Sequence, residues 1–167
     1  MLATNPSRSL LPLDHLVVFT LETQHYALPA AVVERVLRIV EITPVSQAPD
    51  ILLGVIRVHG QIIPVLHVRK RFRLPEYSIS LSDQLIIARS TRRLLALTVD
   101  AVTDVVAYKA LAITAAQTIS SGLTYVQGVA QLGCGLVLIH DIDTFLSLDE
   151  THALDKALLS IDIIPQG

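Results

Sequence analysis

Cysteine is almost absent from this sequence: Cys134 is the only one in 167 residues. A single cysteine excludes a disulfide within the chain, and chains without disulfides are typical of a reducing compartment. Cys134 stands between two glycines in an apolar stretch without a basic neighbour. We therefore expect a small buried side chain here rather than a nucleophile.

An excess of basic residues is also lacking. The 13 lysines and arginines stand against 15 aspartates and glutamates, which gives a formal net charge of −2. A protein that binds the phosphate backbone of nucleic acids normally carries a basic surplus. Nucleic acid is therefore not an expected partner.

Long apolar runs are missing as well, although 51% of the residues are hydrophobic. No run reaches the roughly 18 consecutive apolar residues of a membrane-spanning helix. No basic region precedes the first apolar residues, so a signal peptide is not expected. These features predict a soluble, cytoplasmic protein that is not inserted in a membrane. Residues 110–140 lack Asp, Glu, Lys and Arg, but polar residues and a glycine interrupt them at Thr114, Gln117, Ser120, Ser121, Gly122, Gln127 and Gln131.

What the sequence does contain is a succession of short β-branched apolar segments separated by turns. Residues 1–14 hold two prolines and no period, which predicts an extended tail. The segments that follow predict an all-β barrel or sandwich architecture. Strands are expected at 15–21, 25–28, 36–42, 54–60, 61–66, 84–88, 94–99, 102–108, 126–132 and 136–139.

Only the C-terminal region, residues 149–167, predicts a helix. Ser147 stands three residues before Glu150, which is the spacing of a capping box. An amphipathic face follows it. The residues of this face are Leu154, Ala157, Leu158 and Ile161.

Two segments of the chain resemble each other. Gly54-Val55 and Gly128-Val129 lie 74 residues apart, and apolar residues coincide along both segments at this shift. A repeat of this length predicts two similar β units in tandem within residues 15–148, with a boundary at about 75–85.

No catalytic signature is present. The sequence has no Gly-x-Ser-x-Gly turn and no phosphate-binding Gly-Lys-Ser/Thr. His140, Asp141 and Asp143 offer metal donors, but no second His or Cys lies at a ligand spacing. His152 is expected to be an exposed helical histidine, and the basic residues 69–73 a solvated turn. We expect no catalytic residue, no metal site and no cofactor.

An ordered series of short motifs resembles the CheW-type chemotaxis coupling family over about 15–148. Their order and spacing carry the resemblance, since no single tetrapeptide is decisive. The motifs are Tyr26-Ala27-Leu28-Pro29, Val33-x-x-Val36, Ile42-Thr43-Pro44-Val45, Pro49, Gly54-Val55-Ile56, Gly60-x-Ile62-Ile63-Pro64-Val65, Val99-Asp100-Ala101-Val102-x-Asp104-Val105 and Gly128-Val129.

The resemblance implies a fold and a function. The fold is two five-stranded antiparallel barrels packed together, with a C-terminal helix after them. The function is a non-catalytic adaptor that couples a chemotaxis-type histidine kinase to chemoreceptors. The kinase's regulatory domain would dock on one barrel, and the tip of a receptor helical hairpin would enter the groove between the barrels.

The resemblance also implies site residues. Those for the receptor are Val33, Arg35, Val36 and His59, and those for the kinase are Gly54, Ile56, Arg57 and Val58. Because strand faces alternate, about half of the apolar anchors Val33, Val36, Ile56 and Val58 are expected to be buried.

Three positions depart from the family pattern. Arg35 stands where the family usually has Glu, His59 where it has Arg before a glycine, and His67 where it has Asp. Arg57 and His59 point to the same side of a strand, so Arg57 could supply the missing cation. The alternative is a specialised scaffold with a non-standard partner. A rival of another class is a small-molecule sensor with its ligand between the barrels.

Overall fold

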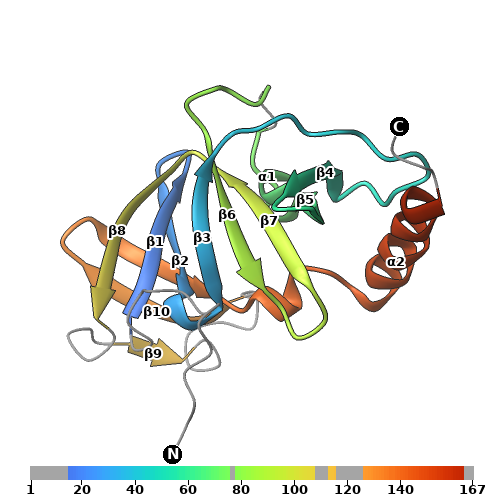
Figure 1. The fold of residues 1–167 in the computed structure, drawn as a ribbon. Coiled ribbons are helices and arrows are strands. Elements are labelled where there is room, and N and C mark those ends of the chain that lie inside the picture. Colours follow the sequence, from blue (N-terminus) through green and yellow to red (C-terminus); the bar gives the residue numbers. More distant parts are fainter. Residues whose placement is uncertain (1–14, 76–77, 108–112, 116–125, 164–167) are drawn as a thin grey trace, which may run out of the picture.

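The computed structural model describes residues 15–75, 78–107, 113–115 and 126–163. These residues form two β-sheets packed together, with one long helix near the C-terminal end (Figure 1). The predicted mostly-β class and the terminal helix are confirmed. The predicted extended tail at 1–14 and the last four residues of the chain lie outside the described residues.

Sheet A has six strands and sheet B has five. The strand order of sheet A is β8 (Ala101–Ala107), β1 (His15–Leu21), β2 (Gln24–Pro29), β11 (Gly135–His140), β10 (Val126–Leu132) and β9 (Ile113–Ala115). The order of sheet B is β3 (Val33–Arg38), β6 (Gln84–Arg89), β7 (Leu94–Val99), β5 (Gln61–Leu66) and β4 (Leu52–Val58). The helical segments are η1 (Ala30–Val32), α1 (Val68–Arg71), η4 (Ile142–Thr144) and α2 (Leu148–Ile163).

The sheets are mixed rather than purely antiparallel. One parallel pair occurs in each: β11 beside β2 in sheet A, and β5 beside β7 in sheet B. Parallel neighbours need a long connection between them, and the chain provides it by forming other strands in the interval. The expectation of all-antiparallel pairing is therefore corrected at these two pairs.

The two sheets are interleaved along the chain. The chain forms β1 and β2 of sheet A, then all five strands of sheet B, and then returns to complete sheet A. The connection at 75–85, where the sequence predicts a boundary, links β5 to β6, which belong to the same sheet. Apolar periodicity reports which segments are strands, but it does not reveal which distant strands pair, because that depends on contacts remote in sequence.

The 74-residue repeat coincides with two hairpins of the same form. β4–β5 in sheet B and β10–β11 in sheet A begin and end 74 residues apart. Both interrupt their pairing register at equivalent places, between Leu52 and Gly54 and between Val126 and Gly128. A short helical turn, α1 or η4, then follows at the same shift. The predicted similarity of the two segments is confirmed.

Alternation along the strands produces three apolar clusters. In β1, Leu16 and Val18 point into sheet A's own cluster, whereas Val17 and Phe19 point toward sheet B. The cluster between the sheets is the largest and includes residues of both. Burial of the apolar side chains in this cluster is the main stabilising contribution to the packing of the two sheets. The inter-sheet cluster comprises Val17, Phe19, Leu21, Tyr26, Leu28, Ala30, Val33, Leu52, Leu66, Val68, Ile86, Ala88, Leu95, Leu97, Val99, Ile142, Phe145 and Leu154.

The basic residues 69–73 are not simply a solvated turn. They form α1 and its end, and two arginine side chains point back onto the protein. Arg69 pairs with Glu22 and Asp100, and Arg71 pairs with Glu150. The prediction of a solvated turn is wrong because the carboxylates that pair with these arginines lie in turns remote in sequence and in α2.

The capping box at the start of α2 is confirmed. The Glu150 backbone N–H donates to Ser147 Oγ at 3.1 Å, and the Ser147 N–H donates to Glu150 Oε1 at 2.8 Å. Arg71 pairs with the same carboxylate. Burial raises the pKa of Glu150, but the bonds from Ser147 and Arg71 outweigh it and hold the pKa below its ordinary value.

Replacing Glu150 by alanine is expected to lower the free energy of unfolding by about 1 kcal/mol at pH 7. Because folding favours the charged carboxylate, its stabilisation is present above the unfolded pKa of about 4.3 and is lost as pH falls through the folded pKa. Urea unfolding at pH 7 and pH 3 should therefore show a smaller difference between the two proteins at pH 3. Asp149→Ala, at an exposed neighbour, is the control. An equal difference in the free energy of unfolding at both pH values would show that the charged Glu150 carboxylate does not stabilise the fold.

Candidate functional site

The β4–β5 hairpin projects a short polar turn. β4 ends at Val58, and His59 and Gly60 have φ of +49° and +78° before β5 begins. Two consecutive residues with positive φ are typical of a type I′ hairpin turn. We call residues 57–61 the hairpin tip. It presents exposed Arg57 and His59 with half-buried Val58 between them.

The prediction that Arg57 and His59 lie on one side of a strand is wrong. The strand ends at Val58, and the left-handed backbone at His59 breaks the alternation on which the prediction depended. His59 is instead the first residue of the turn.

Two of the predicted kinase-binding residues lie beneath the surface. Ile56 is 2% exposed in the apolar cluster of sheet B. Gly54 is buried against Thr43, and a Cβ at this position would lie 2.3 Å from the Thr43 carbonyl oxygen. Arg57 and Val58 remain as the side chains that reach the surface. Ile56 and Gly54 can therefore shape the hairpin but offer no contact area.

The predicted receptor-binding residues of β3 also include both buried and exposed side chains. Val33 is fully buried in the inter-sheet cluster, and Val36 is half-buried against it. Arg35 is exposed, and the neighbouring Glu34 accepts a hydrogen bond at 2.9 Å from Arg89 Nε. About half of the four apolar anchors are thus buried, as expected from strand alternation.

The structure does not join Arg35 to His59. β3 and β4 are the opposite edge strands in the order of sheet B. Within the described part of the chain, neither side chain forms an ion pair, and Arg57 forms none either. These three residues are therefore exposed charges or titratable groups available to a partner.

An open groove of about 410 Å³ continues from the hairpin tip along β5. Apolar side chains from β5 and α2 line it, and Arg89 and Arg93 stand at its wall. The sequence indicates no role for these arginines, because it predicts residues 89–93 only as the polar turn between two strands. The contact that positions Arg93 is an ion pair with Asp155 of α2, which is remote in sequence.

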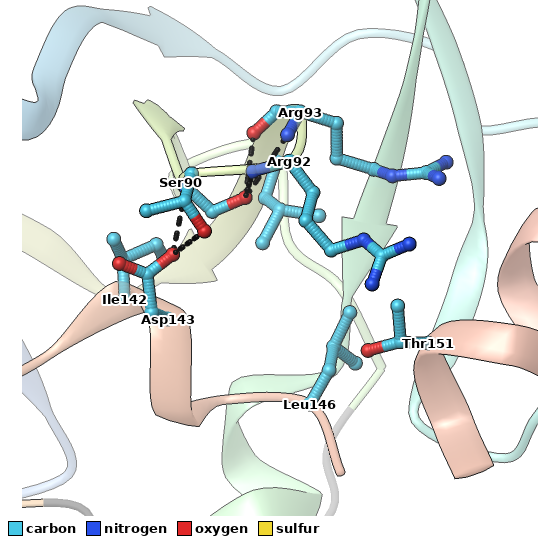
Figure 2. A pocket seen from close by; sticks show the side chains of 9 residues that line it. Ser90, Arg92, Arg93, Ile142, Asp143, Leu146 and Thr151 are labelled. Carbon is cyan, nitrogen blue, oxygen red and sulfur yellow. Dashed lines mark hydrogen bonds between the residues drawn. The ribbon is translucent and has the colours of Figure 1, made fainter. Parts of the chain in front are cut away.

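A smaller cavity lies between the β6–β7 turn, η4 and α2 (Figure 2). Ser90, Arg92, Asp143, Leu146 and Thr151 are among its lining residues, and its volume is about 50 Å³. Small-molecule sites usually begin at roughly 300 Å³. The interface between the sheets is itself filled by the inter-sheet cluster. The cavity in Figure 2 is smaller than such sites, so it does not supply the pocket of the predicted rival, a small molecule bound between the sheets.

The suspected metal donors do not converge. His140 is 2% exposed and packs among rings, with centroid distances of 4.5 Å to Phe72 and 5.6 Å to Phe145. Asp141 accepts from the N–H of Asp143, whose own carboxylate points to Thr91. No group of three or more metal-ligating side chains occurs in the part of the chain that the structure describes.

Two further expectations concern single side chains. Cys134 is exposed rather than buried, because it occupies the turn between β10 and β11, outside the sheet. His152 is an exposed residue of α2, as predicted. In the described ranges, no helix has both the length and the apolar character needed to cross a membrane.

A comparison with known protein families identifies the family of this chain. The family model described as CheW-like domain matches residues 15–150, which include both sheets and the hairpin tip. The chain belongs to the CheW-like domain family. The CheW-like domain thus spans all of the described strands and ends within the first turn of α2.

Individual CheW proteins agree with this assignment. The chemotaxis protein CheW of Klebsiella aerogenes is 26% identical over 146 residues, covering 86% of this chain and 88% of the relative. CheW of Treponema pallidum is 23% identical over 145 residues, covering 83% and 85%. The crystal structure of the scaffolding protein TtCheW from Thermoanaerobacter tengcongensis superposes with a TM-score of 0.74 at 26% identity, covering 83% of this chain and 96% of that one.

These comparisons confirm two expectations from the sequence. The resemblance to the CheW family and the mostly-β fold class are both supported by the family match and the superposition. CheW-like scaffold proteins are not catalysts, which confirms that this chain is not an enzyme.

Proposed function

We propose that this CheW-like chain is an adaptor that couples a chemotaxis-type histidine kinase to chemoreceptors, in chemotaxis or in pilus-type motility. The observation that carries the proposal is an exposed, cationic hairpin tip on a scaffold domain of this family. The adaptor acts in the cytoplasm and is recruited to receptor arrays at the membrane.

The kinase's regulatory domain docks on the hairpin tip. Arg57 and Val58 provide an exposed cation beside a half-buried apolar side chain, and the groove along β5 extends this surface. Interfaces draw most of their binding energy from a few such anchors, while charged neighbours set specificity and association rate. Ile56 and Gly54 support the hairpin from below.

The receptor tip contacts the β3 side and His59. Of the predicted receptor-binding residues of β3, Arg35 and Val36 reach the surface, and Val33 holds this strand against the inter-sheet cluster. Arg35 and His59 depart from the family's usual residues. They therefore tune which receptor is bound.

Reversing the charge of Arg57 should weaken binding of the kinase's regulatory domain. We expect Arg57→Glu to raise Kd about tenfold, or ~1.4 kcal/mol, because it reverses the charge of an exposed side chain at the centre of the proposed docking surface. Isothermal titration calorimetry with the purified domain measures this. Arg38→Glu is the matched control, since Arg38 is an exposed arginine at the end of β3. Equal Kd values for the Arg57 variant and the wild type would contradict the docking site.

Restoring the family's usual charges should change receptor choice. We expect the double variant Arg35→Glu with His59→Arg to bind a conventional receptor tip several-fold more tightly than the wild type does. Titration of a receptor helical-hairpin fragment into the wild type, each single variant and the double variant measures the effect. Unchanged or weaker binding by the double variant would show that these two positions do not set receptor choice.

A further inference from the structure

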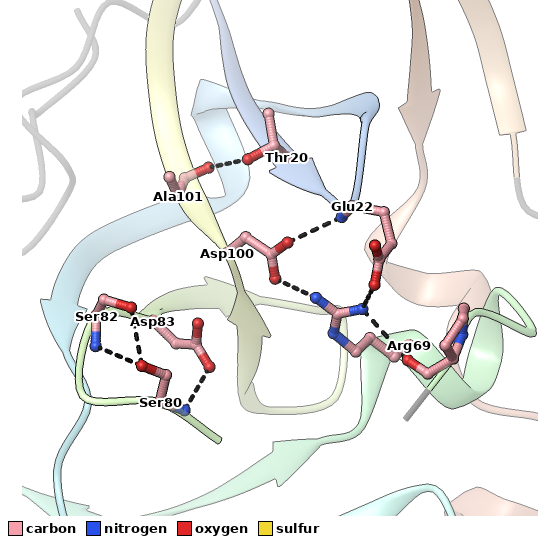
Figure 3. Close-up of polar contacts among 9 residues, drawn as sticks. Thr20, Glu22, Arg69, Ser80, Ser82, Asp83, Asp100 and Ala101 are labelled. Atoms are coloured by element: carbon pink, nitrogen blue, oxygen red, sulfur yellow. Dashed lines mark hydrogen bonds and ion pairs between the residues drawn. The ribbon is translucent and has the colours of Figure 1, made fainter. Parts of the chain in front are cut away.

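Three charged side chains join α1 to the turn of the neighbouring sheet (Figure 3). Arg69 follows β5 of sheet B and pairs with Glu22, in the β1–β2 turn of sheet A, and with Asp100 at 2.5 Å. Asp100 is already fixed to sheet A, because its N–H donates to the Thr20 carbonyl at 3.0 Å and its carboxylate accepts from the Glu22 N–H at 2.8 Å. We call this group the Arg69 clasp.

A second contact joins η4 to the turn of the opposite sheet. Asp143 follows β11 of sheet A, and its Oδ1 accepts from the backbone N–H of Thr91 at 2.7 Å and from Thr91 Oγ1 at 3.1 Å. Thr91 lies in the β6–β7 turn of sheet B, beside the cavity in which Figure 2 shows Asp143. We call this pair the Asp143 clasp.

The two clasps are reciprocal. Arg69 and Asp143 are 74 residues apart, so they occupy the same position of the repeat, one residue after the start of each helical turn. Each belongs to the turn that follows the hairpin of one sheet, and each binds the turn between two strands of the other sheet. Equivalent polar contacts therefore join α1 of sheet B to sheet A and η4 of sheet A to sheet B.

The apolar packing between the sheets does not by itself fix their angle. Burial of the inter-sheet cluster contributes a large but non-directional stabilisation. Charged hydrogen bonds are directional, and a forked guanidinium that holds two carboxylates constrains both of them. Burial lowers the pKa of Arg69, but the bonds to Glu22 and Asp100 hold it above its ordinary value, so the clasp stays charged.

We propose that Arg69 and Asp143 are positioning residues that fix the orientation of sheet A relative to sheet B. Removing either clasp leaves the apolar interface in place but allows the sheets to rotate against each other. The inference concerns the geometry of the chain alone, so it can succeed or fail independently of the proposed partners.

The chain offers a direct way to measure this orientation. Cys134 is its only cysteine and is exposed in sheet A's β10–β11 turn. An exposed position of the equivalent hairpin in sheet B, Gln61→Cys, supplies a second attachment point. Spin labels on these two cysteines report the distance between the sheets by pulsed electron paramagnetic resonance, in the full chain and without any partner.

We expect a single narrow distance distribution in the labelled protein. Arg69→Gln and Asp143→Asn should each broaden or shift it, and the double variant should show the largest change. Arg38→Gln, which removes an exposed arginine of sheet B, is the matched control and should leave the distribution unchanged. Thr91→Ala is a milder variant that removes only one bond of the Asp143 clasp, and it should give a smaller change.

Thermal unfolding of the same variants separates orientation from global stability. A changed distance distribution in variants that still unfold cooperatively supports the positioning role. Distributions identical to that of Arg38→Gln, in the single and double variants alike, would overturn it. If the double variant does not fold, Thr91→Ala and Asp143→Asn decide the question by the same comparison.

Discussion

Replacing Gly54 by alanine is expected to lower the free energy of unfolding by about 2–4 kcal/mol. The backbone of Gly54 has φ of +156°, and a Cβ would lie 2.3 Å from the Thr43 carbonyl oxygen and 2.8 Å from its carbon. That carbonyl accepts the N–H of Val55 at 2.8 Å, in a bridge that continues sheet B beyond β3. Alanine must therefore break this bridge or displace β4.

Urea unfolding of Gly54→Ala measures the loss. Gly133→Ala is the control, because Gly133 has open space where its Cβ would lie and should change stability by less than about 0.5 kcal/mol. The variant also separates two roles of Gly54. If the folded variant still binds the kinase's regulatory domain as the wild type does, Gly54 contributes to stability and not to docking; weaker binding would show that it acts on docking through the hairpin's shape. A variant as stable as the wild type would contradict the close approach of β4 to Thr43.

Truncating Leu154 should have an effect of similar size. The side chain is fully buried and is the residue that α2 contributes to the inter-sheet cluster. Leu→Ala substitutions in such positions cost about 2–5 kcal/mol, from the lost transfer energy and from the cavity that remains. We expect Leu154→Ala to lower stability by about 3 kcal/mol and to loosen α2.

Leu159 of the same helix is the matched control. It is 62% exposed, so Leu159→Ala should change stability by less than about 0.5 kcal/mol. Chemical unfolding followed by circular dichroism compares the two variants, and hydrogen exchange reports the protection of α2. Equal stabilities for the two variants would show that α2 is not anchored through Leu154. The result matters for function because Leu158 lines the groove that extends from the hairpin tip.

Local features of the fold were predictable from the sequence. The strands at 94–99 and 126–132 have the predicted limits, and the capping box of Ser147 and Glu150 forms as expected. These features depend on alternation, β-branched content and the spacing of two residues, all of which are local.

Long-range pairing explains what the sequence did not show. The predicted strand at 36–42 is instead Val33–Arg38, because β6 pairs with residues 33–38 and not with residues 39–42. The inward arginines of α1 depend on carboxylates in remote turns. At the candidate site, alternation indicated how many anchors are buried, but the positive φ of His59 arises from the hairpin turn and moved this side chain off the strand face.

The most direct test of the proposed function asks whether the protein links the kinase to a chemoreceptor. The kinase is sedimented with vesicles that contain a chemoreceptor, with and without this protein. We predict that the kinase pellets with the vesicles only when the protein is present, and that Arg57→Glu abolishes most of this recovery while Lys156→Glu, at an exposed position of α2, does not. Kinase that remains in the supernatant whether or not the wild-type protein is added would contradict the adaptor role.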